Sequence, residues 1–491
     1  MMRTSGVLMH ISSLPSPGGI GSLGKEAYDF ADFLHASGFG IWQVLPVGPV
    51  GYGESPYQSS SVFAGNPLLI SCRMLRKDHL LTYEDDEELV PENESSIDYP
   101  AVRKNKEMLL RRCFSESGNA IKPQVELFRR NNPWVDGFAL FTAVKSYFSG
   151  EMFSRWPDHE IALRKPEAVR KYTELLRPEI DFHIFCQYLF YTQWSALKKY
   201  CNDRSILLFG DMPIYVAEDS ADTWTHPEIF QLDKNRIPKK VAGVPPDYFS
   251  EDGQLWGNPL YRWGYLRRKK YDWWIERMKG MSSLFDIIRI DHFIGFANYY
   301  SIKYGMPNAR KGRWIPGPGK KLFMTLRKEL PDIRIVAEDL GCVNKRVEKL
   351  LAWCGYPGMK IMIFGFDSDE TNPHFIGQYT SNSVAYTGTH DNDTTLGWAQ
   401  KAAPEVLSFA EKTLGFSSPE GAPEAFIHAL FASPCDTVIV PMQDILGLNG
   451  DARMNFPGTI GGNWSWRMKP DAVSKDLSLK YYTLNRKTDR R

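Results

Sequence analysis

The feature that most constrains this chain is a series of short apolar segments that each end in polar or charged residues. The eight segments lie at residues 6–12, 39–49, 205–216, 284–293, 333–341, 359–367, 383–391 and 437–447. Near-continuous apolar runs of this length are typical of strands buried on both faces in a parallel sheet. Helical patterns lie between them, as where Ala27, Phe30 and Leu34 repeat along one helix face. About eight alternations of strand and helix predict an α/β fold, a (β/α)8 TIM barrel.

The length of the chain predicts large insertions into this barrel. A minimal barrel needs about 250 residues, and the chain has 491. The largest gap between expected strands, residues 70–200, is charged and mostly helical in pattern, and a second gap spans residues 217–283. We therefore expect one catalytic domain over residues 1–491, with a mainly helical subdomain at 70–200 and a second subdomain at 217–283.

Composition excludes several classes of function. Lys and Arg total 59 against 58 for Asp and Glu, so the charge gives no case for binding nucleic acid or an anionic membrane. The seven cysteines are scattered and form no C-x-x-C pair, which argues against a disulfide framework and a Cys-based zinc site. No segment approaches the ~20 apolar residues of a membrane span. These features predict a reduced, cytoplasmic protein, and the charge balance fits a neutral substrate.

The segment FDIIRIDHFIGF, residues 285–296, breaks an apolar run with charged side chains. Side chains alternate along a strand, so Ile287, Arg289 and Asp291 face one way. The carboxyl ends of barrel strands form the mouth in which active sites lie. Asp291 is therefore placed for chemistry rather than for packing.

Other expected strands end in the same manner. Their polar ends supply Asp211, Glu338, Asp367, His390 and Asp391. Carboxylates gathered at one mouth repel one another and raise each other's pKa. We expect Arg289 to keep Asp291 ionised by lowering its pKa by about 1–3 units, and an apolar lid to raise the pKa of Glu338. One ionised and one protonated carboxyl group are the machinery of a retaining glycosidase, in which Asp291 attacks and Glu338 protonates the leaving group.

Simpler interpretations exist for each of these residues. A carboxylate at the end of a strand is often a helix cap or a partner in an ion pair, as Arg289 and Asp291 could be. The segment HDND, residues 390–393, could form a turn or a metal site. Recurrence at several strand ends, beside loops rich in aromatic residues, favours a catalytic site.

Longer motifs bear a family resemblance that covers nearly the whole chain. They are LMHISSLPSPGGIGSLG, GYGESPYQSSSVFAGNP, GDMPIYV, GVPPDYFSEDGQLWGNPLY, RIDHFIGF, VAEDLG, GTHDNDT and FPGTIGGNWSWRM. Together they resemble the amylomaltases, also called disproportionating enzymes or 4-α-glucanotransferases, which are related to the α-amylases and share their barrel.

The resemblance assigns roles to individual residues. It implies Asp291 as nucleophile, Glu338 as acid/base and Asp391 as the carboxylate that stabilises the transition state. It implies sugar-binding roles for Tyr57, Asp211, Asp247, Glu251, Gln254, Trp256, Arg289, His292, Asp367, His390 and Asn463. It implies no cofactor and no metal, a monomer or homodimer, and malto-oligosaccharide, amylose or glycogen-derived α-1,4-glucan as substrate.

The loop at about 247–258 resembles a lid over the acceptor side of the site. Trp256, which lies between Gly253 and Gly257, could close over a sugar, stack on it and exclude water, although it could also be a surface anchor. The function expected is transfer of α-1,4-glucan segments through a covalent glycosyl-enzyme. The alternatives are a retaining hydrolase of the α-amylase type, a non-catalytic glucan-binding protein and, more distantly, a metal-dependent hydrolase.

Overall fold

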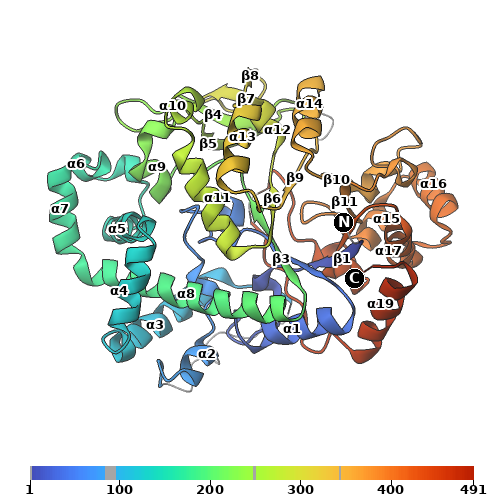
Figure 1. Ribbon diagram of the computed structural model, residues 1–491, viewed down its shortest axis with the longest axis horizontal. Helices are drawn as coiled ribbons and strands as arrows, with labels where there is room; N and C mark the ends of the chain where they lie inside the picture. Colours follow the sequence, from blue (N-terminus) through green and yellow to red (C-terminus); the bar gives the residue numbers. More distant parts are fainter. Residues whose placement is uncertain (1–2, 83–94, 247–249, 342–343, 460, 491) are drawn as a thin grey trace.

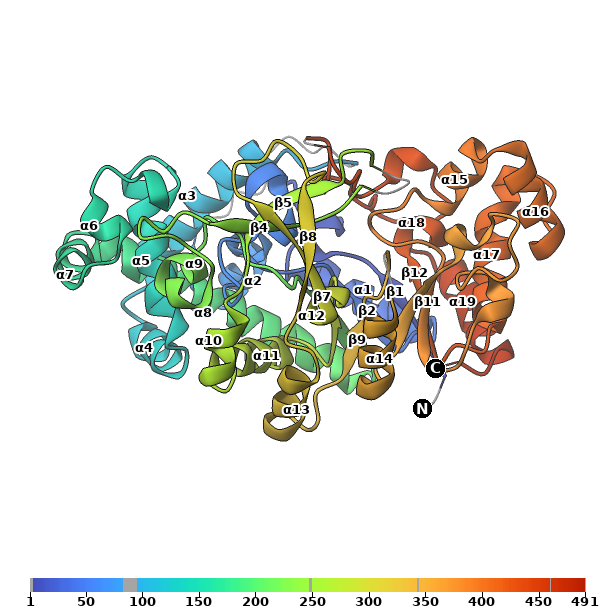
Figure 2. The same ribbon diagram turned by 90° about the horizontal axis from the view of Figure 1, so that it is seen from above.

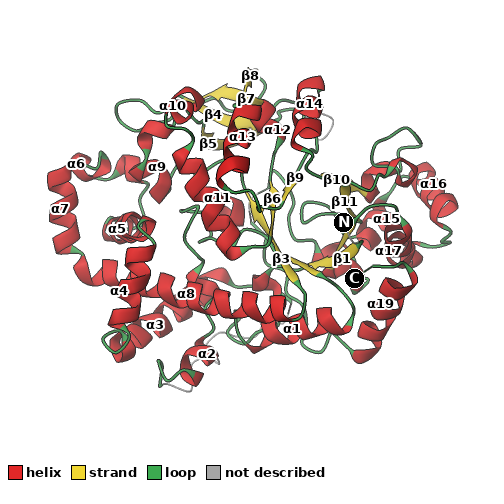
Figure 3. Cartoon of the chain, in the orientation of Figure 1, coloured by secondary structure: helices red, strands yellow, loops and turns green. Residues whose placement is uncertain are grey.

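Eight parallel strands form the centre of the computed structural model, which describes residues 3–82, 95–246, 250–341, 344–459 and 461–490. The strands are β1 Thr4–Leu8, β2 Ile41–Gln43, β3 Leu207–Met212, β6 Ile287–Ile290, β9 Ile335–Ala337, β10 Gly358–Ile361, β11 Ser383–Tyr386 and β12 Thr437–Pro441. Their order in the sheet is β10-β11-β12-β1-β2-β3-β6-β9, and every pairing is parallel. Each lies within or beside one of the eight apolar segments, which confirms the predicted barrel (Figure 3).

The barrel closes between β9 and β10, the two ends of this sheet. The amide of Ala337 donates to the carbonyl oxygen of Pro357 at 2.9 Å. The amide of Met359 donates to Oδ1 of Asp339 at 2.8 Å. Asp339 follows the catalytic candidate Glu338 directly, yet its side chain joins two strands, which is a structural role.

Helices surround the barrel strands. The helices that alternate with the barrel strands along the chain include α1 Lys25–Ala36, α11 Asp272–Leu284, α13 Lys320–Glu329, α14 Lys345–Cys354, α17 Ala422–Ala432 and α19 Lys475–Lys487. In α1 the face predicted to be apolar is buried, and the ring of Phe30 packs 4.9 Å from that of Trp42 in β2. The helix pattern thus covers the outside of the barrel, as the alternation of elements requires.

The segment between β2 and β3 is mainly helical. Its helices are α2 Cys72–Lys77, α3 Tyr99–Ser117, α4 Lys122–Asn131, α5 Trp134–Tyr147, α6 His159–Ala162, α7 Pro166–Leu175 and α8 Arg177–Asp203. Figure 1 shows α4 to α7 on one side of the molecule, joined to the barrel by the long helix α8. The other helices of the chain are α9 Ala221–Thr225, α10 Trp263–Arg268, α12 Ile294–Ala297, α15 Thr395–Lys401, α16 Pro404–Leu414 and α18 Met442–Ile445.

A second, antiparallel sheet has the order β5-β4-β7-β8. Its strands are β4 Lys240–Val244, β5 Gln254–Pro259, β7 Asn298–Lys303 and β8 Gly312–Pro316. Figure 2 places it between the helices of the 99–203 segment and the pair α15 and α17. Two of its strands come from the predicted insertion at 217–283, and two come from residues 298–316, for which the sequence patterns predicted no strand.

The described residues contain no helix that is long and apolar enough to cross a membrane. Six of the seven cysteines lie in this part of the chain, and all six are free thiols.

Two buried glutamines of α8 fix the loops that follow β2. The side chain of Gln187, which is fully buried, accepts from the amide of Gly65 at 2.8 Å and donates to its carbonyl oxygen at 3.0 Å. Gln193 makes the same pair of hydrogen bonds with Ser71, at 2.8 and 3.0 Å. Each glutamine therefore satisfies both backbone groups of a buried loop residue, as a neighbouring strand would.

We predict that Gln187→Leu and Gln193→Leu each lower the free energy of unfolding. Each substitution leaves one buried N–H and one buried C=O without a hydrogen-bond partner, and each such group costs about 1–3 kcal/mol of folding free energy. Thermal melting measures the loss. The control is Gln124→Leu on the exposed side of α4, which should change the melting temperature little. An unchanged melting temperature in both buried variants would contradict the pairing.

Candidate active site

An open groove of about 470 Å³ lies at the carboxyl ends of the barrel strands. Loops that follow β3, β6, β9 and β11 line it, together with the second sheet and the segment 455–464. Nine of the predicted site residues line the groove: Tyr57, Gln254, Trp256, Arg289, Asp291, His292, Glu338, His390 and Asp391. The site therefore lies where barrel active sites are expected.

Arg289 holds two carboxylates at the floor of the groove. Arg289 and Asp211 pair directly across β6 and β3, and both are buried, at 4% and 1% exposure. Nη1 of Arg289 lies 2.7 Å from each carboxylate oxygen of Asp211. Nη2 lies 3.0 Å from Oδ1 of Asp291. A guanidinium that bonds two carboxylates in a low-dielectric site fixes the orientation of both.

Aromatic rings form one wall of the groove above this ion pair. The hydroxyl of Tyr57 donates to Oδ2 of Asp211 at 2.7 Å. The ring of Tyr57 stacks on His390, with centroids 5.2 Å apart and planes 19° apart, and packs 5.7 Å from Trp464. Flat rings beside polar groups are a suitable surface for a sugar, which has apolar faces and hydroxyl edges.

Glu338 is held by the backbone rather than by a side chain. Its Oε2 accepts from the amide of His292 at 2.6 Å, and its Oε1 accepts from the amide of Leu340 at 2.6 Å. His292 has a φ of 51°, in the left-handed region that a residue with a Cβ rarely adopts. Backbone in such a conformation persists where the surroundings enforce it, often at functional sites. Here the turn after β6 places Asp291 in the groove and presents the amide of His292 to Glu338.

Both candidate catalytic carboxyl groups have a raised pKa. Burial raises the pKa of Asp291 to about 8, opposed by Arg289 and reinforced by Asp211, Glu338 and Asp391. Burial raises the pKa of Glu338 to about 7, again opposed by Arg289. The rise in the pKa of Glu338 was predicted. The predicted lowering of the pKa of Asp291 was wrong, because Arg289 is shared with Asp211 and the effect of burial outweighs that of Arg289. The charge of Glu338 is among the causes that raise the pKa of Asp291, so ionisation of one group opposes ionisation of the other.

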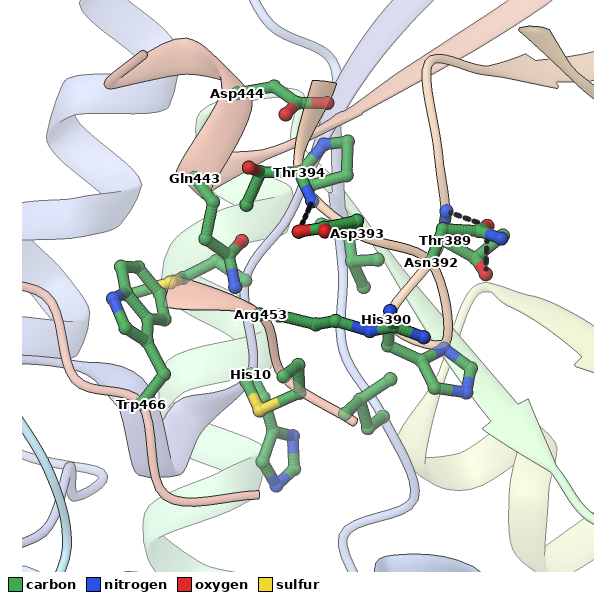
Figure 4. A pocket seen from close by; sticks show the side chains of 15 residues that line it. His10, Thr389, His390, Asn392, Asp393, Thr394, Gln443, Asp444, Arg453 and Trp466 are labelled. Carbon is green, nitrogen blue, oxygen red and sulfur yellow. Dashed lines mark hydrogen bonds between the residues drawn. The ribbon is translucent and has the colours of Figure 1, made fainter. Parts of the chain in front are cut away.

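Asp391 lies in a tight turn at the end of β11. The side chain of Asn392 accepts from the amide of Thr389 at 2.8 Å, which closes the turn drawn in Figure 4. Oδ1 of Asp391 accepts from the side-chain amide of Asn455 at 2.6 Å and lies 3.4 Å from Nε2 of His390. HDND therefore forms a turn that also presents Asp391 to the groove. Across the described ranges, no group of three or more His, Cys, Asp or Glu side chains could hold a metal ion.

Strand β5 brings two predicted residues over the groove. Trp256 is half-buried, and its ring meets that of His292 edge to face, with centroids 4.8 Å apart. Nε1 of Trp256 donates to Oε1 of Gln254 at 3.1 Å. Nε2 of His292 is buried without a hydrogen-bond partner among the residues that the structure describes.

Four further predicted sugar contacts lie elsewhere. Asp211 is behind Arg289 and Tyr57 rather than on the groove surface. Glu251 is exposed in the turn before β5. Asp367 is exposed and accepts from the side chain of Asn372 at 2.8 Å, which stabilises its own loop. Asn463 accepts from the amide of Phe456 at 2.9 Å and so shapes the 455–464 segment. Asp247 lies outside the described residues, and sugar contacts by all five stay predictions.

The structure also brings in residues that the sequence did not single out. Asn455, Tyr215, Trp314 and Trp464 all line the groove. Trp464 lies within the motif FPGTIGGNWSWRM, and Asn455 lies directly before it, so this Gly- and aromatic-rich loop was the available signal. Trp314 lies on β8, an exposed strand whose sequence contains no comparable motif.

Comparison with known proteins places these features in one family. A family model described as 4-alpha-glucanotransferase matches residues 9–474. The chain is 42% identical to a 4-alpha-glucanotransferase of Clostridium butyricum, over 97% of this chain and 99% of that one. It is 43% identical to one of Thermus thermophilus, over 99% of each chain. The solved structure of an amylomaltase from Streptococcus agalactiae in complex with acarbose superposes with a TM-score of 0.97, at 40% identity and 99% coverage of both chains.

We predict that Glu338→Gln changes how stability depends on pH. The pKa of Glu338 is near 7 in the folded protein against an ordinary value of 4.5, so ionisation costs more in the folded state. The wild type therefore loses stability as pH rises from about 4.5 to about 7, and the Gln variant does not lose this part. The measurement is the melting temperature of both proteins at several pH values. The melting temperature of the variant minus that of the wild type should increase as pH rises.

The matched control is Glu174→Gln on the exposed side of α7. Its melting temperature should differ from that of the wild type by a similar amount at every pH. A difference for Glu338→Gln that is likewise independent of pH would contradict the raised pKa.

Proposed function

The chain belongs to the 4-alpha-glucanotransferase family, and on that premise we propose that it transfers α-1,4-glucan segments by a retaining double displacement in which Asp291 is the nucleophile. The observation that carries this assignment is the placement of Asp291 and Glu338 in one groove, with Asp291 beside Arg289 and Glu338 on the amide of His292, the residue after Asp291. A retaining mechanism needs such a pair, with the charge on one carboxyl group and the proton on the other. Arg289, 3.0 Å from Asp291, opposes the rise in the pKa of Asp291 and so favours its ionised form.

In the first half of the reaction, a carboxylate oxygen of Asp291 attacks the anomeric carbon of a bound glucan. The bond between that carbon and the glycosidic oxygen breaks, and Glu338 gives its proton to the departing oxygen. The product is a glycosyl-enzyme, joined through an ester bond to Asp291, and a shortened glucan with a free 4-hydroxyl group. Asp391 stabilises the positive charge that develops on the sugar ring.

In the second half, Glu338 accepts the proton of an incoming 4-hydroxyl group. The hydroxyl oxygen attacks the anomeric carbon, the ester bond to Asp291 breaks, and Asp291 is again a carboxylate. Two inversions restore the original configuration. These carboxyl groups complete the cycle, so the reaction calls for no cofactor.

The groove supports a neutral glucan as the substrate. Its walls combine the rings of Tyr57, Trp464 and Trp256 with the polar side chains of Gln254 and Asn455, which suits the faces and hydroxyl groups of successive sugars. We propose malto-oligosaccharides, amylose or glycogen-derived chains as donors and acceptors. We also propose that the segments 70–200 and 217–283 act as subdomains around one catalytic barrel, in a cytoplasmic monomer or homodimer.

A trapping experiment tests the nucleophile. Glu338→Gln should form a stable glycosyl-enzyme with α-maltotriosyl fluoride, because fluoride leaves without an acid whereas release of the sugar needs a base. Intact-mass spectrometry should show one added maltotriosyl group, and peptide mapping should place it on Asp291. The control is the double variant Asp291→Asn/Glu338→Gln, which should stay unlabelled. Label on another residue, or in the control, would rule out Asp291 as the nucleophile.

A second experiment tests the lid. Trp256→Ala should raise the ratio of hydrolysis to transfer, because the ring that closes the groove over His292 no longer excludes water from the glycosyl-enzyme. Free reducing ends and oligosaccharide products, measured in the same reaction, give the ratio. Leu255→Ala, an exposed neighbour on the same strand, is the matched control. An equal ratio in the two variants would refute the role of Trp256.

A further inference from the structure

Arg453 and Asn455 form a bridge between the turn of Asp391 and the wall of the groove. Nη2 of Arg453 donates to the backbone oxygen of Asp391 at 2.6 Å, and Nε donates to the backbone oxygen of Asn455 at 2.7 Å. The side-chain amide of Asn455 donates to Oδ1 of Asp391 at 2.6 Å. Figure 4 shows the side chain of Arg453 extending toward His390. One arginine thus holds two backbone segments together at the position where Asn455 meets Asp391.

We propose that Asn455 is a positioning residue that orients the carboxylate of Asp391 toward the sugar, with Arg453 fixing the two backbones between which it acts. This inference rests on the proposed role of Asp391 in the reaction. Neither Arg453 nor Asn455 was among the predicted site residues, because 62 and 64 positions separate them from Asp391 in the chain.

The need for such a residue follows from the exposure of Asp391. Its side chain is 45% exposed, so packing does not hold its rotamer. The amide of Asn455 engages Oδ1 and leaves Oδ2 for sugar hydroxyl groups. A carboxylate free to rotate would act from the correct position only part of the time, and a displacement of 1 Å in an active site can cost about 10²-fold in rate.

The same segment also places the aromatic wall. The amide of Trp464 donates to the backbone oxygen of Met454, between Arg453 and Asn455, at 2.7 Å. The ring of Trp464 packs against Tyr57 and His390, with centroids 5.7 and 5.8 Å apart. The sugar-contacting wall and the orientation of Asp391 are therefore set by one short stretch of backbone.

The test compares Asn455→Ala with the isosteric Asn455→Asp. The Ala variant removes the donor at every pH. In the Asp variant, the carboxyl group introduced at position 455 can still donate to Asp391 while it is protonated, but two ionised carboxylates repel each other. The described groups that interact electrostatically with Asp391 include Tyr57, Arg453, Asp291 and His390, and burial lowers the pKa of His390. Since two adjacent carboxylates share a proton, Asn455→Asp should work at acid pH and fail as pH rises.

We expect Asn455→Ala to lower kcat for transfer from maltotriose about 10²-fold, with much less change in KM and little change in melting temperature. For Asn455→Asp, kcat should approach that of the wild type at acid pH. As pH rises, kcat of this variant should begin to fall at a lower pH than kcat of the wild type does. Asn449→Ala, which alters an exposed turn upstream, is the control and should keep the wild-type pH profile. If Asn455→Ala does not fold, the pH profile of the isosteric Asp variant still decides the question.

A wild-type kcat in Asn455→Ala, or parallel pH profiles for the Ala and Asp variants, would overturn the inference. The variant Asp391→Asn distinguishes a failure of this inference from a failure of the proposed function. If Asp391→Asn is inactive while Asn455→Ala is fully active, only the positioning role is wrong. If Asp391→Asn keeps wild-type kcat, the role proposed for Asp391 itself is wrong.

Discussion

The buried guanidinium of Arg289 is the interaction on which the rest of the site depends. It joins β6 to β3 through Asp211, and it reaches Asp291 with its other nitrogen. Through Asp211 it also fixes Tyr57, the ring on which His390 stacks. One cation therefore positions Asp291, the proposed nucleophile, and one wall of the groove together. Because this cation is divided between two carboxylates, it does not offset the burial of Asp291, and the pKa of Asp291 rises to about 8.

Glu338, the proposed acid/base, is held in a different way. Glu338 has two backbone amides as its partners, and one of them is presented by the left-handed turn at His292 that follows Asp291. Asp291 and Glu338 are thus tied to the same turn, so a movement of one shifts the other. Donation by amides fixes the position of the carboxyl group without adding a positive charge, and burial keeps its pKa near 7. This arrangement lowers stability at alkaline pH, a common consequence of gathering carboxyl groups for catalysis.

Most of the barrel could be predicted from the sequence, because each strand is a local apolar run and the polar residues of the site follow directly at its end. Asp291, Glu338, His390 and Asp391 were found in this way. What the sequence did not show depends on contacts between distant segments. The second sheet pairs β4 with β7, which come from opposite sides of β6. Asp211 lies behind Tyr57 instead of facing the groove, and Asn455 reaches Asp391 across 64 residues. The pKa of Asp291 was wrong in direction because no local pattern reveals that Arg289 is shared.

The central claim is that a glycosyl-enzyme on Asp291 passes its glucan to a sugar rather than to water. Incubation of the wild-type protein with maltotriose alone, with products resolved by chain length over time, tests this most directly. The account predicts a ladder of oligosaccharides longer than maltotriose, together with glucose and almost no increase in total reducing ends. Glucose and maltose with nothing longer than the substrate, and reducing ends that rise with every cleavage, would contradict it and indicate a hydrolase on the same barrel.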